Sequence, residues 1–163
     1  MKEDHSLQAQ LLQQFRQSLK SVFHHYATFK GRAPRSEFWW FELFEVIVFF
    51  IASLVDDLVL DFVYRKFGFQ YKGSIGILTL ILFVGLLLPG LAVFWRRLHD
   101  TGRSGWYCLM VLIPLSLSTV LSSFSTTGSI MFGILGLIAM VVLLLFCCLD
   151  SQSEDNRYGP FPE

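Results

Sequence analysis

The chain has 163 residues, of which 53% are hydrophobic, 16% aromatic and only 16% charged. A soluble domain carries about 25% charged residues, so this composition indicates a membrane protein. Thirteen basic and thirteen acidic side chains give no net charge at pH 7. This balance argues against a nucleic-acid-binding protein, which needs a basic surface.

Residues 6–29 have the periodicity of an amphipathic helix. Apolar side chains recur every three or four residues from Leu7 to Phe29, while glutamines, Arg16 and Lys20 lie on the opposite face. The pattern is typical of a helix on a membrane surface, and equally of one docked on the protein. We treat residues 1–30 as this N-terminal element, because Gly31 and Pro34 then interrupt the helix.

Four apolar stretches follow, at about residues 38–55, 74–95, 106–121 and 130–149. Their lengths approach the roughly 20 residues with which a helix crosses a bilayer. Pro89 predicts a kink in the second span, because proline leaves a backbone carbonyl without its amide partner. We therefore expect an all-α membrane protein, with a four-helix bundle at residues 31–150 and a polar tail at 151–163.

The distribution of lysine and arginine predicts the orientation of this bundle. Six precede the first span, three follow it, three separate the second and third spans, and one lies in the tail. Cytoplasmic segments are enriched in these residues. We therefore expect four transmembrane helices with both termini in the cytoplasm, an arrangement that puts ten of the thirteen on that side.

This orientation brings three charged blocks of the sequence, residues 31–41, 96–106 and 156–160, to the cytoplasmic interface. Glu42 and Glu45 lie slightly deeper and share a helix face, and we expect them to pair with Arg96 and Arg97, since a carboxylate facing lipid is costly. The candidate ligand- or partner-binding residues are Arg32, Arg35, Glu37, Arg96, Arg97, His99, Asp100, Arg103, Asn156 and Arg157.

These residues suit two interpretations. Guanidinium groups match phosphate oxygens, so the cluster could bind an anionic lipid headgroup, or a partner protein. The same side chains could also be scaffolding that ties helix ends together, with Gly102 and Gly105 permitting a tight turn. We expect no metal and no cofactor, because no HExxH, CxxC or glycine-rich phosphate loop occurs.

Two other functions stay open. An oligomeric channel or small carrier is suggested by Pro89, Pro114 and the small residues of the fourth span, Gly133, Gly136 and Ala139, which let another helix approach closely. An enzyme acting on a lipid phosphate would use His99 and Asp100. Adjacent residues on a helix point about 100° apart, however, so His99 and Asp100 cannot easily act together on one group. We therefore favour a non-enzymatic protein without catalytic residues.

Three motifs resemble a known family. They are F-x-G-R-x-x-R-x-E-F-W-W-F at 29–41, R-R-L-H-D-x-G-R-S-G-W at 96–106 and N-R-Y-G-P at 156–160. Their order and spacing resemble the bacterial inner-membrane family called domain of unknown function 805, with the N-terminal helix outside the match. The resemblance implies a small multi-span protein of the bacterial cytoplasmic membrane and brings no activity with it. It adds Tyr158 to the candidate residues.

Overall fold

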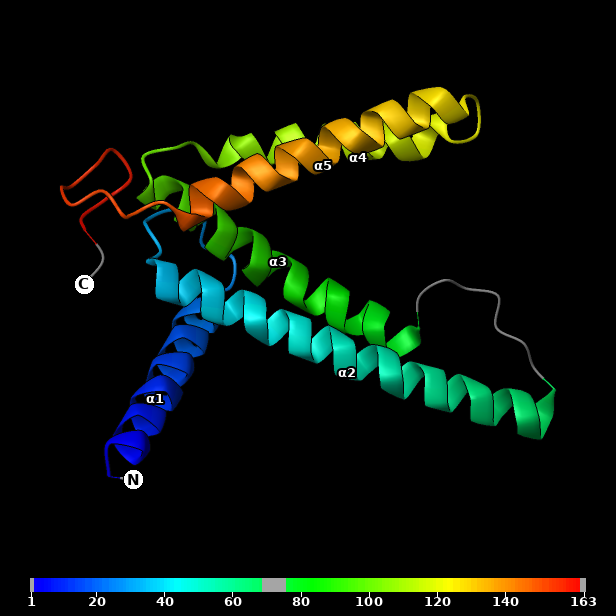
Figure 1. Ribbon diagram of the computed structural model, residues 1–163, viewed down its shortest axis with the longest axis horizontal. Helices are drawn as coiled ribbons and strands as arrows, with labels where there is room; N and C mark the ends of the chain where they lie inside the picture. The colour runs from blue at the N-terminus through cyan, green and yellow to red at the C-terminus, as the bar shows by residue number, and fades with distance from the viewer. Residues whose placement is uncertain (1, 69–75, 162–163) are drawn as a thin grey trace. The chain divides into compact units, whose positions relative to one another are not determined.

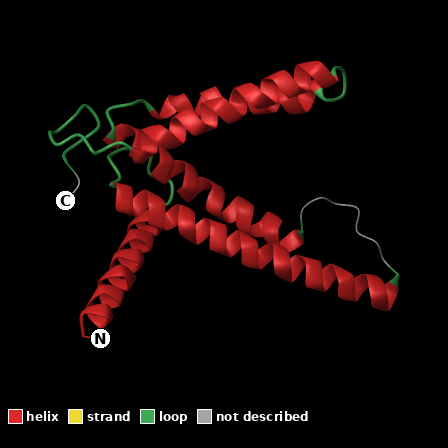
Figure 2. Ribbon diagram, in the orientation of Figure 1, coloured by secondary structure: helices red, strands yellow, loops and turns green. Residues whose placement is uncertain are grey.

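The computed structural model describes residues 2–68 and 76–161. In chain order the elements are α1 (Lys2–His24), α2 (Arg35–Phe67), α3 (Ile77–Asp100), the 3-10 turn η1 (Gly105–Cys108), α4 (Leu109–Leu121) and α5 (Thr126–Cys148) (Figure 1). The described residues contain helices, turns and loops but no strand (Figure 2), so the all-α prediction is confirmed. By length and composition α3 and α5 can each cross a membrane, and Gly105–Leu121 is a shorter apolar helix.

The helices form two compact units. The first unit consists of Met1–Thr28 and Ser36–Ala92, and the second consists of Phe29–Arg35 and Val93–Glu163. The first unit therefore holds α1, nearly all of α2 and most of α3. The second unit holds the end of α3, η1, α4, α5 and the tail.

α2 is longer than the sequence analysis predicted. The predicted span ends at residue 55, whereas the helix continues to Phe67. No glycine or proline interrupts residues 56–67, and the helix ends where Gly68 adopts a positive φ of 67°. The first part of the predicted 56–73 connection is therefore helical, and residues 69–75 lie outside the described part.

α3 continues as one helix through Pro89. A proline has no amide hydrogen, so the carbonyl of Gly85, four residues earlier, loses its helical donor. The hydroxyl of Tyr26, just after α1, donates a hydrogen bond to this Gly85 carbonyl. The carbonyl that the sequence predicts to be freed thus has a partner, and that partner ties the end of α1 to α3.

Replacing Tyr26 with Phe should therefore lower the free energy of unfolding by about 1 kcal/mol, since one hydrogen bond is lost. In a Pro89→Ala background the new amide can serve Gly85 directly, so the same Tyr26 substitution should cost much less. Denaturant unfolding of the four proteins in mild detergent measures this coupling. An equal cost in both backgrounds would show that Tyr26 stabilises the protein in another way.

The start of α3 is capped by a residue of α2. Asp56 is buried, and its carboxylate accepts hydrogen bonds from the backbone nitrogens of Leu78 and Thr79, at 3.0 and 2.8 Å, and from the Thr79 hydroxyl at 2.8 Å. The first amides of a helix lack partners within it, and a negative charge is favourable there. A Cβ at Gly76 would come within 2.1 Å of this carboxylate, so glycine makes room for the cap.

Removal of this cap by Asp56→Ala should cost about 1–2 kcal/mol of stability. The matched control is Asp57→Ala, which removes the neighbouring exposed carboxylate and should change stability by less than about 0.5 kcal/mol. Thermal unfolding in detergent compares the two variants. Similar losses for both would contradict the capping role.

α4 and α5 run side by side in the second unit (Figure 1). A Cβ on Gly136 would come within 2.8 Å of the Leu115 side chain, and Ala139 is buried. The small-residue face predicted on the fourth span is therefore a packing face, and the helix that it admits is α4.

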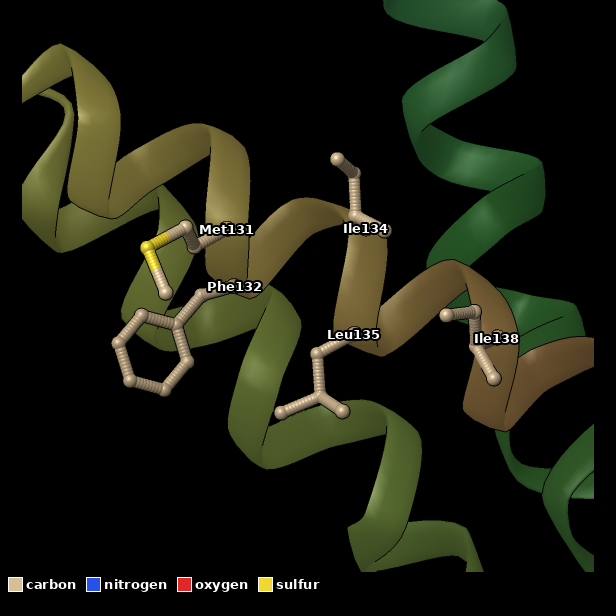
Figure 3. A pocket seen from close by; sticks show the side chains of 5 residues that line it. All are labelled: Met131, Phe132, Ile134, Leu135 and Ile138. Atoms are coloured by element: carbon tan, nitrogen blue, oxygen red, sulfur yellow. The ribbon is translucent and has the colours of Figure 1, made fainter.

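An apolar depression lies along the middle of α5, at residues 131–138. Figure 3 shows the five side chains that line it, and all of them come from α5: Met131, Phe132, Ile134, Leu135 and Ile138. The lining carries no charged or hydrogen-bonding side chain, which suits contact with lipid chains.

Candidate functional site

The site is built around the C-terminus of α3, in the second unit. The backbone nitrogen of Arg103 donates to the Leu98 carbonyl at 2.9 Å, and that of Gly102 donates to the His99 carbonyl at 2.9 Å. Gly102 has a φ of 76°. This is the Schellman arrangement, which requires a residue that tolerates positive φ. The helix therefore covers the first half of the charged motif at 96–106, and the turn and η1 follow it.

Asp100, the last residue of α3, is fully buried and binds two arginines. One carboxylate oxygen accepts from Arg32 Nε at 2.9 Å, and the other accepts from Arg97 Nη1 and from the Ser151 hydroxyl. The side chains of Arg32, Arg97 and Asp100 are at most 1% exposed. A buried carboxylate is tolerated only when it is paired and hydrogen-bonded, as it is here.

Arg97 also satisfies the C-terminal end of α5. Its guanidinium donates to the Cys147 carbonyl at 3.0 Å and to the Leu149 carbonyl. The last carbonyls of a helix lack amide partners and carry partial negative charge, so a cation there is favourable. A third bond, of 3.4 Å, joins Arg97 to the Ala33 carbonyl. One side chain thus connects α3, α5 and the segment before α2.

Arg32 connects the segment before α2 to the tail. Besides Asp100, it donates to the carbonyl of Glu154 at 2.8 Å and to that of Gln152. The Gln152 backbone nitrogen in turn donates to the Asp100 carbonyl at 3.1 Å. We call Arg32, Arg97, Asp100 and Ser151 the polar junction, because segments far apart in sequence meet through these four side chains.

The tail is also held by a stacked pair of rings. The His99 imidazole and the Tyr158 ring lie parallel, with centroids 3.7 Å apart and 5° between the planes. His99 Nδ1 lies 3.2 Å from the Gly31 carbonyl, and Asn156 Nδ2 donates to the His99 carbonyl at 3.0 Å. All three motifs that the sequence singled out therefore meet at the end of α3.

Three further arginines lie around the polar junction. Arg103 donates to the Thr101 carbonyl at 3.1 Å, and its guanidinium carbon lies 4.0 Å from the centroid of the Phe146 ring. Arg157 is exposed, and its guanidinium carbon lies 4.7 Å from the centroid of the Tyr158 ring. Arg35 donates to the Leu149 carbonyl at 2.8 Å and pairs with the exposed Asp150. We call Arg35, Arg103 and Arg157 the outer arginines.

The remaining predicted residues are placed differently. Glu42 and Glu45 belong to the first unit, whereas Arg96 and Arg97 belong to the second. The guanidinium of Arg97 binds Asp100 and carbonyl oxygens, so Asp100 takes the place that we expected the glutamates to hold for this arginine. Glu37, in the first unit, accepts a hydrogen bond from the Ser21 hydroxyl at 3.0 Å. Glu45 instead lies against α3, within 2.9 Å of where a Cβ on Gly90 would sit.

Sequence reasoning missed several members of the site. Ser151 binds Asp100, and Gln152 lies within 2.3 Å of where a Cβ on Gly102 would sit. The carbonyls of Cys147, Leu149, Gln152 and Glu154 are also acceptors. Every residue carries a backbone carbonyl, so the residue types do not reveal which carbonyls accept hydrogen bonds. The only available signal was the polar composition of residues 150–156, directly after an apolar helix.

Two helices long and apolar enough to cross a membrane, joined at their ends by a buried ionic junction, fit a helical membrane protein. The chain belongs to the DUF805 family: the family model, described as a protein of unknown function, matches residues 26–160. The match begins after α1, as the motifs predict.

Two bacterial relatives support this assignment. The inner membrane protein YhaH of Escherichia coli K12 is 34% identical over 142 residues, which are 87% of this chain and 93% of the relative. The inner membrane protein YhaI of the same organism is 32% identical over 143 residues, which are 88% and 92% of the two chains. No solved structure gives a significant match. The chain is therefore a bacterial inner-membrane protein.

Breaking the polar junction should destabilise the protein strongly. Arg97→Gln leaves Asp100 buried with one ionic partner fewer, and losses of this kind are about 3–5 kcal/mol. The control is Arg35→Gln, because the Arg35–Asp150 pair is exposed and should contribute less than about 1 kcal/mol. Thermal unfolding in detergent measures both, and a small loss for Arg97→Gln would contradict the structural role of the junction.

Proposed function

We propose that the chain is a four-span, non-enzymatic protein of the inner membrane, with both termini in the cytoplasm, and that its outer arginines bind anionic lipid headgroups. The observation that carries this proposal is the polar junction. Arg32 precedes α2, Arg97 and Asp100 lie in the last turn of α3, and Ser151 follows α5. Arg32 and Ser151 nevertheless both bind Asp100, and Arg97 binds Asp100 and Ser151.

This meeting point supports an even number of membrane crossings between successive blocks. α2 and α3 are the two helices between Arg32 and Arg97, and α4 and α5 are the two between Arg97 and Ser151. Segments that contact one another at the membrane surface lie on the same side of the membrane. If the first helix of a pair crosses the membrane, the second must therefore cross back. The excess of lysine and arginine in these segments favours the cytoplasmic side.

The headgroup interaction is assigned to the outer arginines rather than to the whole predicted cluster. Arg32 and Arg97 are buried and bind Asp100 and carbonyl oxygens, whereas the outer arginines are half-buried or exposed. Phe146 lies beneath Arg103 and also contacts Tyr107, which is 42% exposed, and Trp106 is 66% exposed. Arginine beside exposed aromatic rings is typical of the headgroup level of a membrane.

The two alternative functions receive less support from the geometry. Asp100 is fully buried and both of its oxygens hold partners, so it offers no access to a lipid phosphate. Two features that suggested an oligomeric transporter have partners within the chain: Tyr26 binds the Gly85 carbonyl below Pro89, and Leu115 covers Gly136. A partner protein in place of lipid is a possible outcome of the test below.

Native mass spectrometry from mild detergent tests the proposal, with phosphatidylglycerol and phosphatidylethanolamine added at equal concentration. The wild type should retain phosphatidylglycerol preferentially, and Arg103→Gln/Arg157→Gln should lower that bound fraction about tenfold, since two charge-assisted contacts are lost. Lys30→Gln is the control, because it removes an exposed charge that is not an outer arginine.

Equal lipid binding by the wild type and the double variant would overturn the headgroup assignment. A co-purifying protein that is lost in the double variant would move the function to a protein partner. The same spectra report the number of subunits, and a higher oligomer would support the transport alternative.

A further inference from the structure

The two halves of α1 have different surroundings. In the C-terminal half, the Phe15 ring contacts Trp40 with centroids 5.6 Å apart, and Phe23 contacts Phe41 at 5.9 Å. Val22 is fully buried. This half of α1 is docked on the start of α2. Of the two alternatives that the sequence left open, a membrane-surface helix and a docked helix, the second therefore holds for these residues.

The N-terminal half continues the same apolar stripe without cover. At 100° per residue, Leu7 and Leu11 lie on the face that carries Phe15 and Val22, and Leu12 lies at its edge. Leu7, Leu11 and Leu12 are nevertheless 56%, 48% and 63% exposed. The stripe that docks α1 therefore runs on past the protein surface that it docks to.

We propose that this exposed half of α1 lies in the headgroup region of the same membrane and binds its lipids. Docking against Trp40, beside Trp39, which is 39% exposed, sets α1 at the level where tryptophan gathers in membrane proteins. An apolar stripe that continues from that point meets lipid rather than water. This inference rests on the inner-membrane location and does not depend on the outer arginines.

Charge complementarity supports the same occupant. Arg16 and Lys20 are exposed on the flank of α1 away from Phe15, where a helix lying in the interface presents cations to anionic headgroups. The Tyr26 bond to Gly85 ties the C-terminal end of α1 to α3. α1 precedes residues 26–160, the region that the family model matches, so this lipid contact lies outside that region.

The experiment places an environment-sensitive fluorophore on α1 of the full chain. In a Cys148→Ser background, which removes the exposed native thiol, Leu11→Cys puts the label on the apolar stripe and Gln13→Cys puts it on the opposite face. Each protein is reconstituted as one copy per nanodisc of phosphatidylethanolamine and phosphatidylglycerol, with and without a lipid that carries a nitroxide near its headgroup. The Cys148→Ser protein without an added cysteine measures labelling of the buried thiols.

The label at position 11 should emit at shorter wavelength and be quenched at least about twofold more strongly than the label at position 13, as expected for an interfacial helix. Equal, weak quenching at both positions would overturn the inference. A label at position 11 that is shielded from water but not quenched by the nitroxide lipid would also overturn the inference. So would shielding that appears only with two copies per disc, and either result would assign this face of α1 to a protein contact. The outcome is separate from lipid retention by the outer arginines, which the Arg103/Arg157 variant reports.

Discussion

The buried carboxylate of Asp100 is the point on which the second unit depends. It lies between Arg32 and Arg97 and also accepts from Ser151, so one acidic side chain binds three segments of the chain. Two guanidinium groups around one carboxylate leave an excess of positive charge in a buried place. The carbonyl oxygens at the end of α5 offset that excess, because they carry the negative end of the helix dipole. The charges and the helix end therefore stabilise each other, and neither is favourable alone.

In the first unit, too, side chains bind backbone groups that lack a partner within their helix. There the side chains are a neutral hydroxyl and a single carboxylate. Pro89 frees the Gly85 carbonyl, and Tyr26 binds it; the start of α3 lacks acceptors for its first amides, and Asp56 supplies them. In an apolar environment an unpaired backbone group is expensive. These two interruptions of the helical hydrogen-bond pattern are each matched by a side chain, one from α2 and one from the segment that follows α1. These matches specify which helices are neighbours.

The sequence predicted the features that follow from composition and period. The helical class, the small-residue face at Gly136 and the freed carbonyl below Pro89 all appear in the structure. The choice of partners could not be predicted. Asp100, Glu42 and Glu45 are all carboxylates near arginine in the sequence pattern, and only the fold decides that Arg97 binds Asp100. Asp56 lies just beyond the predicted first span, and its role as a cap could not be predicted because it requires a contact with residues more than twenty positions later.

The attachment of the tail also bears on how the protein is made. Residues 147–158 supply Ser151, the carbonyls that bind Arg32 and Arg97, and the ring that stacks on His99. A ribosome synthesises these residues last, at the end of α5 and after it, so Asp100 and both arginines are made before these partners exist. The polar junction can therefore be completed only when the last polar segment of the chain has emerged and its hydroxyl and carbonyl groups reach Asp100 and Arg32.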